Sequence, residues 1–244
     1  RQRQMCIRDS YLNIDVKMET GTGKTFTQIK TIYELNLKYG FSKFIIVVPT
    51  LPIKAGTKQF ISSIDTKKFF EDEYEQVEME LRLVESVKNR KGKDYFPSVI
   101  REFATASTLN TKKIQVMLIN SQLITNGKML TKNYDSTILD DLTNPSEAIK
   151  STQPILIIDE PHKFAKENIT FQKIKDILSP QCVIRFGATF PEKKNHEKDY
   201  QNLVYNLGSI EAFNNNLVKG VIAEYVPTCL LYTSDAADDK ARVD

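Results

Sequence analysis

Residues 18–25 read Met-Glu-Thr-Gly-Thr-Gly-Lys-Thr and stand between a strand-like run and a helix-like run. The run before them, residues 14–17, is short and can enter a sheet as a strand. The run after them, residues 26–39, places its apolar side chains at helical spacing. A strand, a glycine-rich turn ending in Gly-Lys-Thr and a helix form the context that a phosphate-binding loop requires. The chain is therefore expected to fold around such a loop.

The residue types in this loop suit the binding of a nucleotide. Gly21 and Gly23 let the backbone curl so that successive N–H groups point at phosphate oxygens. The helix that follows adds the positive end of its dipole at the same place. Lys24 would reach the β- and γ-phosphates of ATP, and the Thr25 hydroxyl would ligate Mg²⁺. The segment predicted to bind the nucleotide comprises Thr20, Gly21, Thr22, Gly23, Lys24 and Thr25.

Met18 is a departure from the usual loop pattern, which has glycine at that position. A bare Gly-Lys-Thr occurs often by chance, and a structural turn is the alternative interpretation. The longer run Thr-Gly-Thr-Gly-Lys-Thr, placed after a strand-like segment, favours the nucleotide site.

Composition limits the classes of protein to which the chain can belong. It has 244 residues, with 41% hydrophobic and 27% charged residues, as ordinary globular proteins do. The net charge of +3 is too small to indicate nucleic-acid binding by itself. No apolar run approaches the roughly 18 residues that a membrane-spanning helix needs, and no secretory signal opens the chain. Cys6, Cys182 and Cys229 have neither metal-binding nor disulfide spacing, so a cytoplasmic protein without membrane partners is expected.

The two ends of the chain look like translated sequencing adapter. The DNA string TGTCTCTTATACACATCTGACGCTGCCGAC encodes residues 229–238, and its reverse complement encodes residues 1–9 in one frame. Residues 1–10 and 229–244 are therefore interpreted as non-native tails flanking a domain of residues 11–228. On this interpretation the chain is a fragment of a longer gene. Source DNA that encodes either end with unrelated codons would contradict it.

Further strand-like runs alternate with helix-like runs along the chain. Residues 44–48 are apolar and mostly β-branched, which is typical of a parallel strand that is covered on both faces. The first two strands are expected to be parallel, and the alternation predicts an α/β three-layer domain with a mainly parallel sheet. Residues 125–151 are polar and contain turn residues. Strands are predicted at residues 11–17, 44–48, 114–119, 155–158 and 182–186, a further strand beginning at 221–226, and helices at 25–39, 53–61, 97–106, 169–178 and 209–219.

Residues 62–113 are the least regular part of the sequence. Apolar residues alternate with charged and polar ones over residues 76–83, which indicates a half-exposed strand. A basic, glycine-containing turn follows at residues 87–94. The whole segment is interpreted as an insertion at the edge of the sheet.

Asp159 and Glu160 are the partners that the phosphate loop needs. Ligands of open α/β sheets bind at the carboxyl ends of the strands, and Asp159 follows an apolar strand-like run. It is therefore expected beside Lys24 and Thr25, where its carboxylate would hold Mg²⁺. Glu160 would then orient or activate the water that attacks the γ-phosphate. The alternative is an acidic pair at a strand end that only faces solvent.

The order of these motifs resembles a known class of motor enzymes. Thr-Gly-Thr-Gly-Lys-Thr, Val-Val-Pro-Thr at residues 47–50, Asp-Glu-Pro-His at 159–162 and Gly-Ala-Thr at 187–189 follow the order seen in superfamily-two helicases and translocases. The first and third of these, with Met-Glu at 18–19, look most like the restriction (Res) subunit of type III restriction–modification enzymes. Asn-Ser-Gln at 120–122 and residues 203–219 are also similar to that family. The resemblance covers residues 11–228 and implies a RecA-like ATP-binding lobe.

The resemblance also implies roles for residues outside the nucleotide loop. His162, with Gly187, Ala188 and Thr189, would couple the nucleotide state to the DNA-facing surface, and His162 counts with Lys24, Asp159 and Glu160 among the catalytic residues. Each assignment has a simpler alternative, because Thr189 can end a strand and His162 can be an ordinary polar neighbour. Sequence-blind contacts to the DNA backbone are expected from Pro49, Thr50, Ser121 and Gln122, although Thr50 can instead cap a helix.

Several parts of such an enzyme have no counterpart in this chain. Superfamily-two motors place ATP between two RecA-like lobes, and the second lobe supplies an arginine finger worth about 10³–10⁵ in rate. Too few residues follow Thr189 for a second lobe or a nuclease domain. The fragment is therefore expected to bind ATP and Mg²⁺ weakly and to hydrolyse ATP near background. The resemblance also implies DNA and a methyltransferase/specificity subunit as partners.

Three functions are weighed on the sequence. The first is the ATP-binding lobe of a type III restriction enzyme, whose full-length form would be an ATP hydrolase and site-specific deoxyribonuclease. The second is the same lobe from another superfamily-two DNA helicase, in repair or phage defence. The third is a non-catalytic nucleic-acid-binding scaffold with a vestigial loop. The intact Lys24, Thr25, Asp159 and Glu160 argue against the third.

Overall fold

The computed structural model describes residues 12–85, 96–110, 112–134, 142–164, 168–192 and 198–218. Three sequence predictions lie outside these ranges: the two adapter-like tails, the basic turn at residues 87–94 and the strand beginning at 221–226. Within the described part of the chain, no helix is both long enough and apolar enough to span a membrane.

The core of the fold is a seven-stranded sheet with the order β3-β4-β2-β5-β6-β1-β7, and every neighbouring pair of strands is parallel. The predicted α/β class with a parallel sheet is confirmed. β2 and β4 are almost wholly buried, as expected for strands covered on both faces. The strands are β1 (Leu12–Met18), β2 (Lys43–Val48), β3 (Glu78–Leu83), β4 (Lys113–Asn120), β5 (Ile155–Asp159), β6 (Cys182–Gly187) and β7 (Leu203–Leu207).

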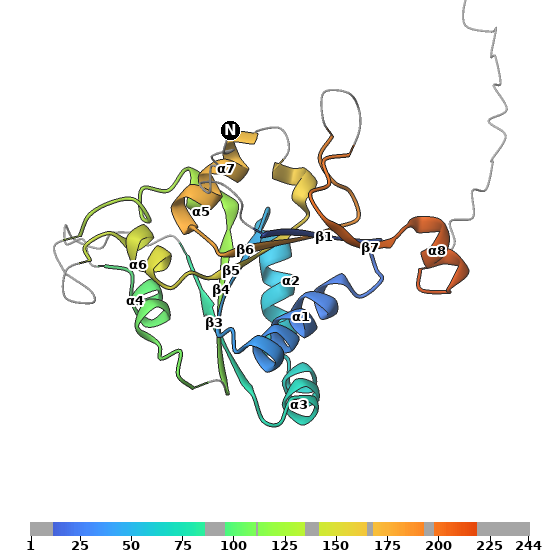
Figure 1. Ribbon diagram of the computed structural model, residues 1–244, viewed down its shortest axis with the longest axis horizontal. Coiled ribbons are helices and arrows are strands. Elements are labelled where there is room, and N and C mark those ends of the chain that lie inside the picture. The colour runs from blue at the N-terminus through green and yellow to red at the C-terminus, as the bar shows by residue number, and fades with distance from the viewer. Residues whose placement is uncertain are drawn as a thin grey trace, which may run out of the picture.

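Helices cover both faces of this sheet, which gives the predicted three layers (Figure 1). Helices α1, α2 and α3 lie on one face, and α4, α5, α6 and α7 lie on the other. The helices are α1 (Lys24–Tyr39), α2 (Leu51–Ser62), α3 (Ile64–Glu73), α4 (Ser98–Thr105), α5 (Ser121–Thr125), α6 (Pro145–Ser151), the 3₁₀ turn η1 (Pro161–Phe164), α7 (Asn168–Leu178) and α8 (Ser209–Asn214).

Each face of the sheet has its own hydrophobic core. Along β2, Ile45 and Val47 pack with α4, α6 and α7, whereas Phe44, Ile46 and Val48 pack with α1, α2 and α3. Side chains of a strand point alternately to its two faces, so one apolar run contributes to both cores. This explains why the strand reads as continuously apolar rather than alternating.

The topology places the two predicted halves of the nucleotide site together. β1 and β2 are parallel, as predicted, but they are not neighbours, because β5 and β6 lie between them. Only β6 separates β1, which leads into the phosphate loop, from β5, which ends at Asp159. Since all these strands run the same way, their carboxyl ends meet at one rim of the sheet.

Within the predicted edge insertion, residues 62–113, the structure contains one helix that was not predicted, α3. The predicted half-exposed strand is β3, which lies at one edge of the described sheet and pairs with β4. The sequence analysis did not predict α3, which packs Phe70 onto Tyr33 of α1 with ring centroids 4.8 Å apart. Helix α4 agrees with the prediction, because Ile100 and Phe103 are fully buried.

Helix α6 corrects the description of residues 125–151 as polar segments with turns. Asn144 and Pro145, which look like turn residues, begin a helix instead. The Asn144 side chain accepts a hydrogen bond from the Ser146 N–H at 2.9 Å, and proline is favoured in the first turn. Ala148 and Ile149 are then fully buried. The helix is too short for its periodicity to stand out in the sequence.

A buried ion pair joins β1 to β6 just before the phosphate loop. Asp15 and Arg185 are register partners, and Nε and Nη2 of Arg185 donate to the two carboxylate oxygens at 2.7 Å each. Asp15 also accepts from the backbone N–H of Gln201 at 2.6 Å. A bidentate ion pair of this kind fixes the register of the two strands and so the position of the loop that follows β1.

Candidate functional site

The predicted phosphate loop has the backbone geometry that an anion cradle needs. Gly21 and Gly23 have φ values of 85° and 87°, in the left-handed region that side chains other than glycine rarely adopt. A Cβ atom added at Gly23 would meet no atom within 4 Å, and one added at Gly21 would have its nearest neighbour at 4.0 Å. The positive φ values, rather than crowding, are therefore what favours glycine here. Helix α1 begins at Lys24, so its N-terminal N–H groups face the loop.

Glu19 shapes the loop, a role that the sequence analysis did not assign. Its carboxylate accepts from the Thr20 N–H at 2.9 Å and from the Ser209 hydroxyl at 2.6 Å, at the start of α8. These two hydrogen bonds lower the pKa of Glu19, Ser209 contributing most. Its carbonyl accepts from the Thr22 hydroxyl at 2.7 Å. The backbone N–H groups of Thr20 and Thr22 both donate to Glu19, the second at 3.3 Å to its carbonyl, so Glu19 holds the loop at two points.

Lys24 lies between the two predicted carboxylates at the rim of the sheet. Its Nζ is 3.4 Å from Oδ1 of Asp159 and also forms an ion pair with Oε1 of Glu160. The three side chains are only 11%, 7% and 16% exposed, respectively. The predicted convergence of Lys24 and Asp159 is therefore observed. The two carboxylates hold the ammonium group of Lys24 at this rim. Carboxylate oxygens are also the ligands that Mg²⁺ prefers.

Gln28 is a second partner of Asp159 that the sequence analysis missed. It lies one turn after Lys24 in α1, and its Nε2 donates to Oδ1 of Asp159 at 2.9 Å. Gln28 is 1% exposed, and its Oε1 is enclosed without a hydrogen-bond partner among the described residues. Helical spacing from the loop lysine was the available signal, but the contact depends on how α1 lies against β5.

His162 connects the acidic pair to the Gly187-Ala188-Thr189 segment. Its Nδ1 is 2.9 Å from the Thr189 hydroxyl and 3.3 Å from Oε2 of Glu160. Burial is the main cause that lowers the pKa of His162 below its ordinary 6.5. Contacts thus run from Lys24 through Glu160 and His162 to Thr189. Thr189 thus forms a hydrogen bond with His162, and its coupling role stays a prediction.

The backbone at this junction is tightly fitted. Glu160 has a φ of 53°, unusual for a residue other than glycine, and its N–H donates to the Phe186 carbonyl at 2.9 Å. A Cβ atom at Gly187 would lie 2.6 Å from Cδ of Pro161 and 3.0 Å from the Thr189 carbonyl oxygen. Glycine at 187 is what lets the two strand ends approach each other.

The residues predicted to contact DNA line one cavity of about 390 Å³ beside the nucleotide site. Thr50 is the N-cap residue of α2, but its hydroxyl makes no capping hydrogen bond, so the capping alternative is not observed. Lys163 and Lys173 line the same cavity from η1 and α7, and the sequence analysis missed them. The cavity is lined by Pro49, Thr50, Ser121, Gln122, Thr125, Asn126, Lys163, Phe164, Thr170 and Lys173.

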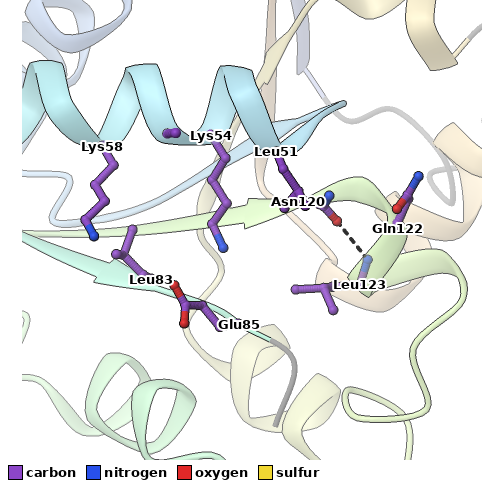
Figure 2. A pocket seen from close by; sticks show the side chains of 9 residues that line it. Leu51, Lys54, Lys58, Leu83, Glu85, Asn120, Gln122 and Leu123 are labelled. Atoms are coloured by element: carbon purple, nitrogen blue, oxygen red, sulfur yellow. Dashed lines mark hydrogen bonds between the residues drawn. The ribbon is translucent and has the colours of Figure 1, made fainter. Parts of the chain in front are cut away.

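A second cavity, of about 540 Å³, is lined by α2 and shares Gln122 with the first (Figure 2). Lys54 and Lys58 project into it from α2 towards Leu83 and Glu85 at the end of β3. Lys54 donates to the Val84 carbonyl, and burial lowers its pKa. Asn120 also lines this cavity, and its side chain accepts a hydrogen bond from the Leu123 N–H at 3.1 Å. This cavity is therefore partly apolar and carries more positive than negative charge.

Comparison with known proteins identifies close relatives of the chain. Residues 6–192 match the family model described as "Type III restriction enzyme, res subunit". The chain is 48% identical over 211 residues to the Type III restriction-modification enzyme EcoP15I Res subunit of Escherichia coli, with 85% of this chain and 21% of that protein covered. It is 41% identical over 228 residues to the StyLTI Res subunit of Salmonella typhimurium, with 89% and 23% covered.

The match to solved structures is more distant. A nuclease-deletion mutant of the Type ISP restriction-modification enzyme LlaGI, in complex with a DNA substrate mimic, aligns with a TM-score of 0.49 and 18% identity. The alignment covers 86% of this chain and 19% of that chain. Against the curated relatives, too, the chain spans about a fifth of their length.

Proposed function

The chain belongs to the family of type III restriction enzyme Res subunits, and from that premise we propose that it is the ATP-binding lobe of an ATP-dependent DNA translocase. The observation that carries the proposal is the contact of Lys24, after the phosphate loop, with both Asp159 and Glu160 at the end of β5. A lysine that follows a glycine loop and faces two carboxylates is the arrangement that nucleotide hydrolysis uses.

In this proposal each residue of the rim has a defined task toward Mg²⁺–ATP. The N–H groups of Gly21, Gly23, Lys24 and Thr25 would hold phosphate oxygens, and Lys24 would leave the carboxylates to contact the β- and γ-phosphates. Thr25 and Asp159 hold the metal, directly or through water. Glu160 orients the attacking water and accepts its proton. Bound Mg²⁺ would neutralise charge that develops on the phosphate oxygens.

We assign the cavity beside this site to the backbone of a DNA strand. Its walls offer hydroxyl and amide groups from Thr50, Ser121 and Gln122, which bind phosphate and sugar without reading sequence. Lys163 and Lys173 are exposed at the same cavity and supply positive charge. His162 contacts Glu160 and precedes Lys163 within η1, so a change at Glu160 has a short path to the strand.

The activities of a whole Res-type protein extend this proposal. Because the chain spans about a fifth of its curated relatives, a second lobe with an arginine finger and a nuclease domain are proposed for a longer protein. That protein would cleave DNA together with a methyltransferase/specificity subunit. For this chain alone we propose ATP binding with hydrolysis near background.

The test measures ATP hydrolysis by the 244-residue chain with and without DNA, beside a longer version that includes the proposed second lobe. We expect background turnover for the chain and DNA-stimulated turnover for the longer protein. Robust DNA-stimulated turnover by the chain alone would contradict the assignment as one lobe. A longer protein that binds DNA but no ATP would favour the scaffold alternative.

A further inference from the structure

Gln28 is one of two buried polar residues on the core-facing side of α1, and the other, Asn36, is paired with the Phe41 carbonyl. The buried positions that follow Gln28 include Ile29 and Ile32, which pack in the core beneath the sheet. The Gln28 amide donates to Asp159, but its carbonyl oxygen is enclosed and unpaired among the described residues. An unpaired buried carbonyl costs free energy that leucine or methionine would avoid. Packing alone therefore does not explain why a glutamine occupies this buried position.

The chemistry of the contact fixes the direction of the amide. Turning it over would bring Oε1 of Gln28 against the carboxylate of Asp159, and two acceptors cannot share a hydrogen bond. The unpaired carbonyl is thus a consequence of directing the N–H group at Asp159. The NH₂ group of the Gln28 amide donates to one carboxylate oxygen of Asp159, Oδ1, at 2.9 Å.

We infer that Gln28 is a positioning residue that holds Asp159 in the orientation in which it receives Mg²⁺. This inference rests on the proposed ATP site. Without nucleotide, Oδ1 of Asp159 has two donors, Lys24 and Gln28. When phosphate draws Lys24 away, Gln28 is the side-chain donor that remains among the described residues.

The uncharged nature of Gln28 suits this task. A lysine or arginine at the same place would hold the carboxylate but would also compete with the metal for its charge. An amide fixes the rotamer and leaves the full negative charge for Mg²⁺. Gln28 and Lys24 both contact Oδ1 of Asp159, and within the described part of the chain Oδ2 has no hydrogen-bond partner, so it is the oxygen left for the metal or its water. Outer partners that orient a metal ligand in this way typically affect metal affinity 10- to 100-fold.

The experiment titrates the full chain with fluorescent mant-ATP, once with excess EDTA and once with saturating Mg²⁺. The quantity of interest is the gain in affinity that Mg²⁺ provides. Gln28→Met keeps the length and burial of the side chain but removes the donor, so it should reduce that gain about tenfold. The affinity in EDTA should stay within about twofold. Tyr33→Phe, on the same buried face of α1, is the matched control and should keep the full gain.

A double variant separates positioning from a general disturbance of the helix. In an Asp159→Asn background, where the metal carboxylate is gone, Gln28→Met should cause no further loss of the Mg²⁺-dependent gain. Equal gains in wild type and Gln28→Met, or additive losses in the double variant, would overturn the inference while leaving the ATP site intact. Wild type that binds no mant-ATP would overturn the proposed function and this inference with it. Thermal melting of each variant verifies that it is folded.

Discussion

Nζ of Lys24 lies 3.4 Å from Oδ1 of Asp159, at the rim where β1 and β5 end. In this arrangement the ammonium group occupies the place that the proposed metal would share with a triphosphate, since it also contacts Glu160. On the proposed function, nucleotide binding requires Lys24 to move from carboxylate to phosphate. Gln28 would then remain as the side chain that orients Asp159.

A first prediction concerns pH and His162. Burial lowers the pKa of His162 in the folded chain below 6.5, so below pH 6.5 the unfolded chain takes up this proton first. The free energy of unfolding contributed by this residue is thus unaffected well above pH 6.5 and falls as the pH drops through that value. NMR titration should give a pKa below 6.5 for His162, and His196→Gln assigns the signal, because the chain has two histidines. A pKa above 6.5 would show that Glu160 dominates the environment of the ring.

A second prediction concerns the close approach at Gly187. In Gly187→Ala the new Cβ meets Pro161 at 2.6 Å, so either the strand end or η1 has to move. Overpacking of this kind costs about 1–3 kcal/mol, which urea denaturation measures directly. Gly56→Ala is the matched control, because Gly56 lies in α2 with open space around it and should gain about 0.5–1 kcal/mol. Equal stabilities for the two variants would refute the assigned packing.

A third prediction concerns the buried pair of Asp15 and Arg185. Asp15→Asn leaves the guanidinium 3% exposed and without its charged partner, which should cost about 3–5 kcal/mol of unfolding free energy. The double variant with Arg185→Met removes both charges and should recover most of that loss. Urea denaturation of both variants measures this recovery. A double variant less stable than Asp15→Asn would mean that Arg185 contributes mainly through its hydrogen bond to the Asp199 carbonyl.

A fourth prediction concerns the lysines at the 390 Å³ cavity. If a single DNA strand lies along it, Lys163→Ala and Lys173→Ala should each weaken binding and lower the salt dependence of the affinity by roughly 0.7 in log–log slope. Fluorescence anisotropy with labelled single-stranded DNA of random sequence, over a range of salt concentrations, gives both quantities. Lys112→Ala removes the same charge from the opposite rim, at the start of β4, and should change neither. Loss of binding in all three variants alike would indicate only non-specific attraction.

The sequence predicted much of the fold because its strands are long apolar runs that end in polar motifs. The phosphate loop, the acidic pair and the strands at residues 44–48 and 114–119 are local patterns, and the structure has them where they were expected. The order of the strands is not local. It separates β1 from β2 and brings β5 near β1, and no single segment of the sequence carries that information.

The parts of the site that the sequence analysis missed are those that depend on tertiary packing. Gln28 looks like an ordinary polar residue of a helix until α1 lies against Asp159. Lys163 and Lys173 are isolated lysines until the fold places η1 and α7 at the same cavity as Pro49 and Thr50, just before α2. Residues alone also left open which superfamily-two family the chain belongs to, and similarity to Res subunits decided that question.

The affinity of the chain for Mg²⁺–ATP tests the central claim most directly. Isothermal titration with a non-hydrolysable ATP analogue should detect binding by wild type. Lys24→Ala should weaken it roughly 10- to 100-fold, because a charge-assisted contact to phosphate is lost. Lys30→Ala, which removes the same charge further along α1, should bind like wild type. Unchanged affinity in Lys24→Ala, or no binding by wild type, would contradict the assignment of this rim as the nucleotide site.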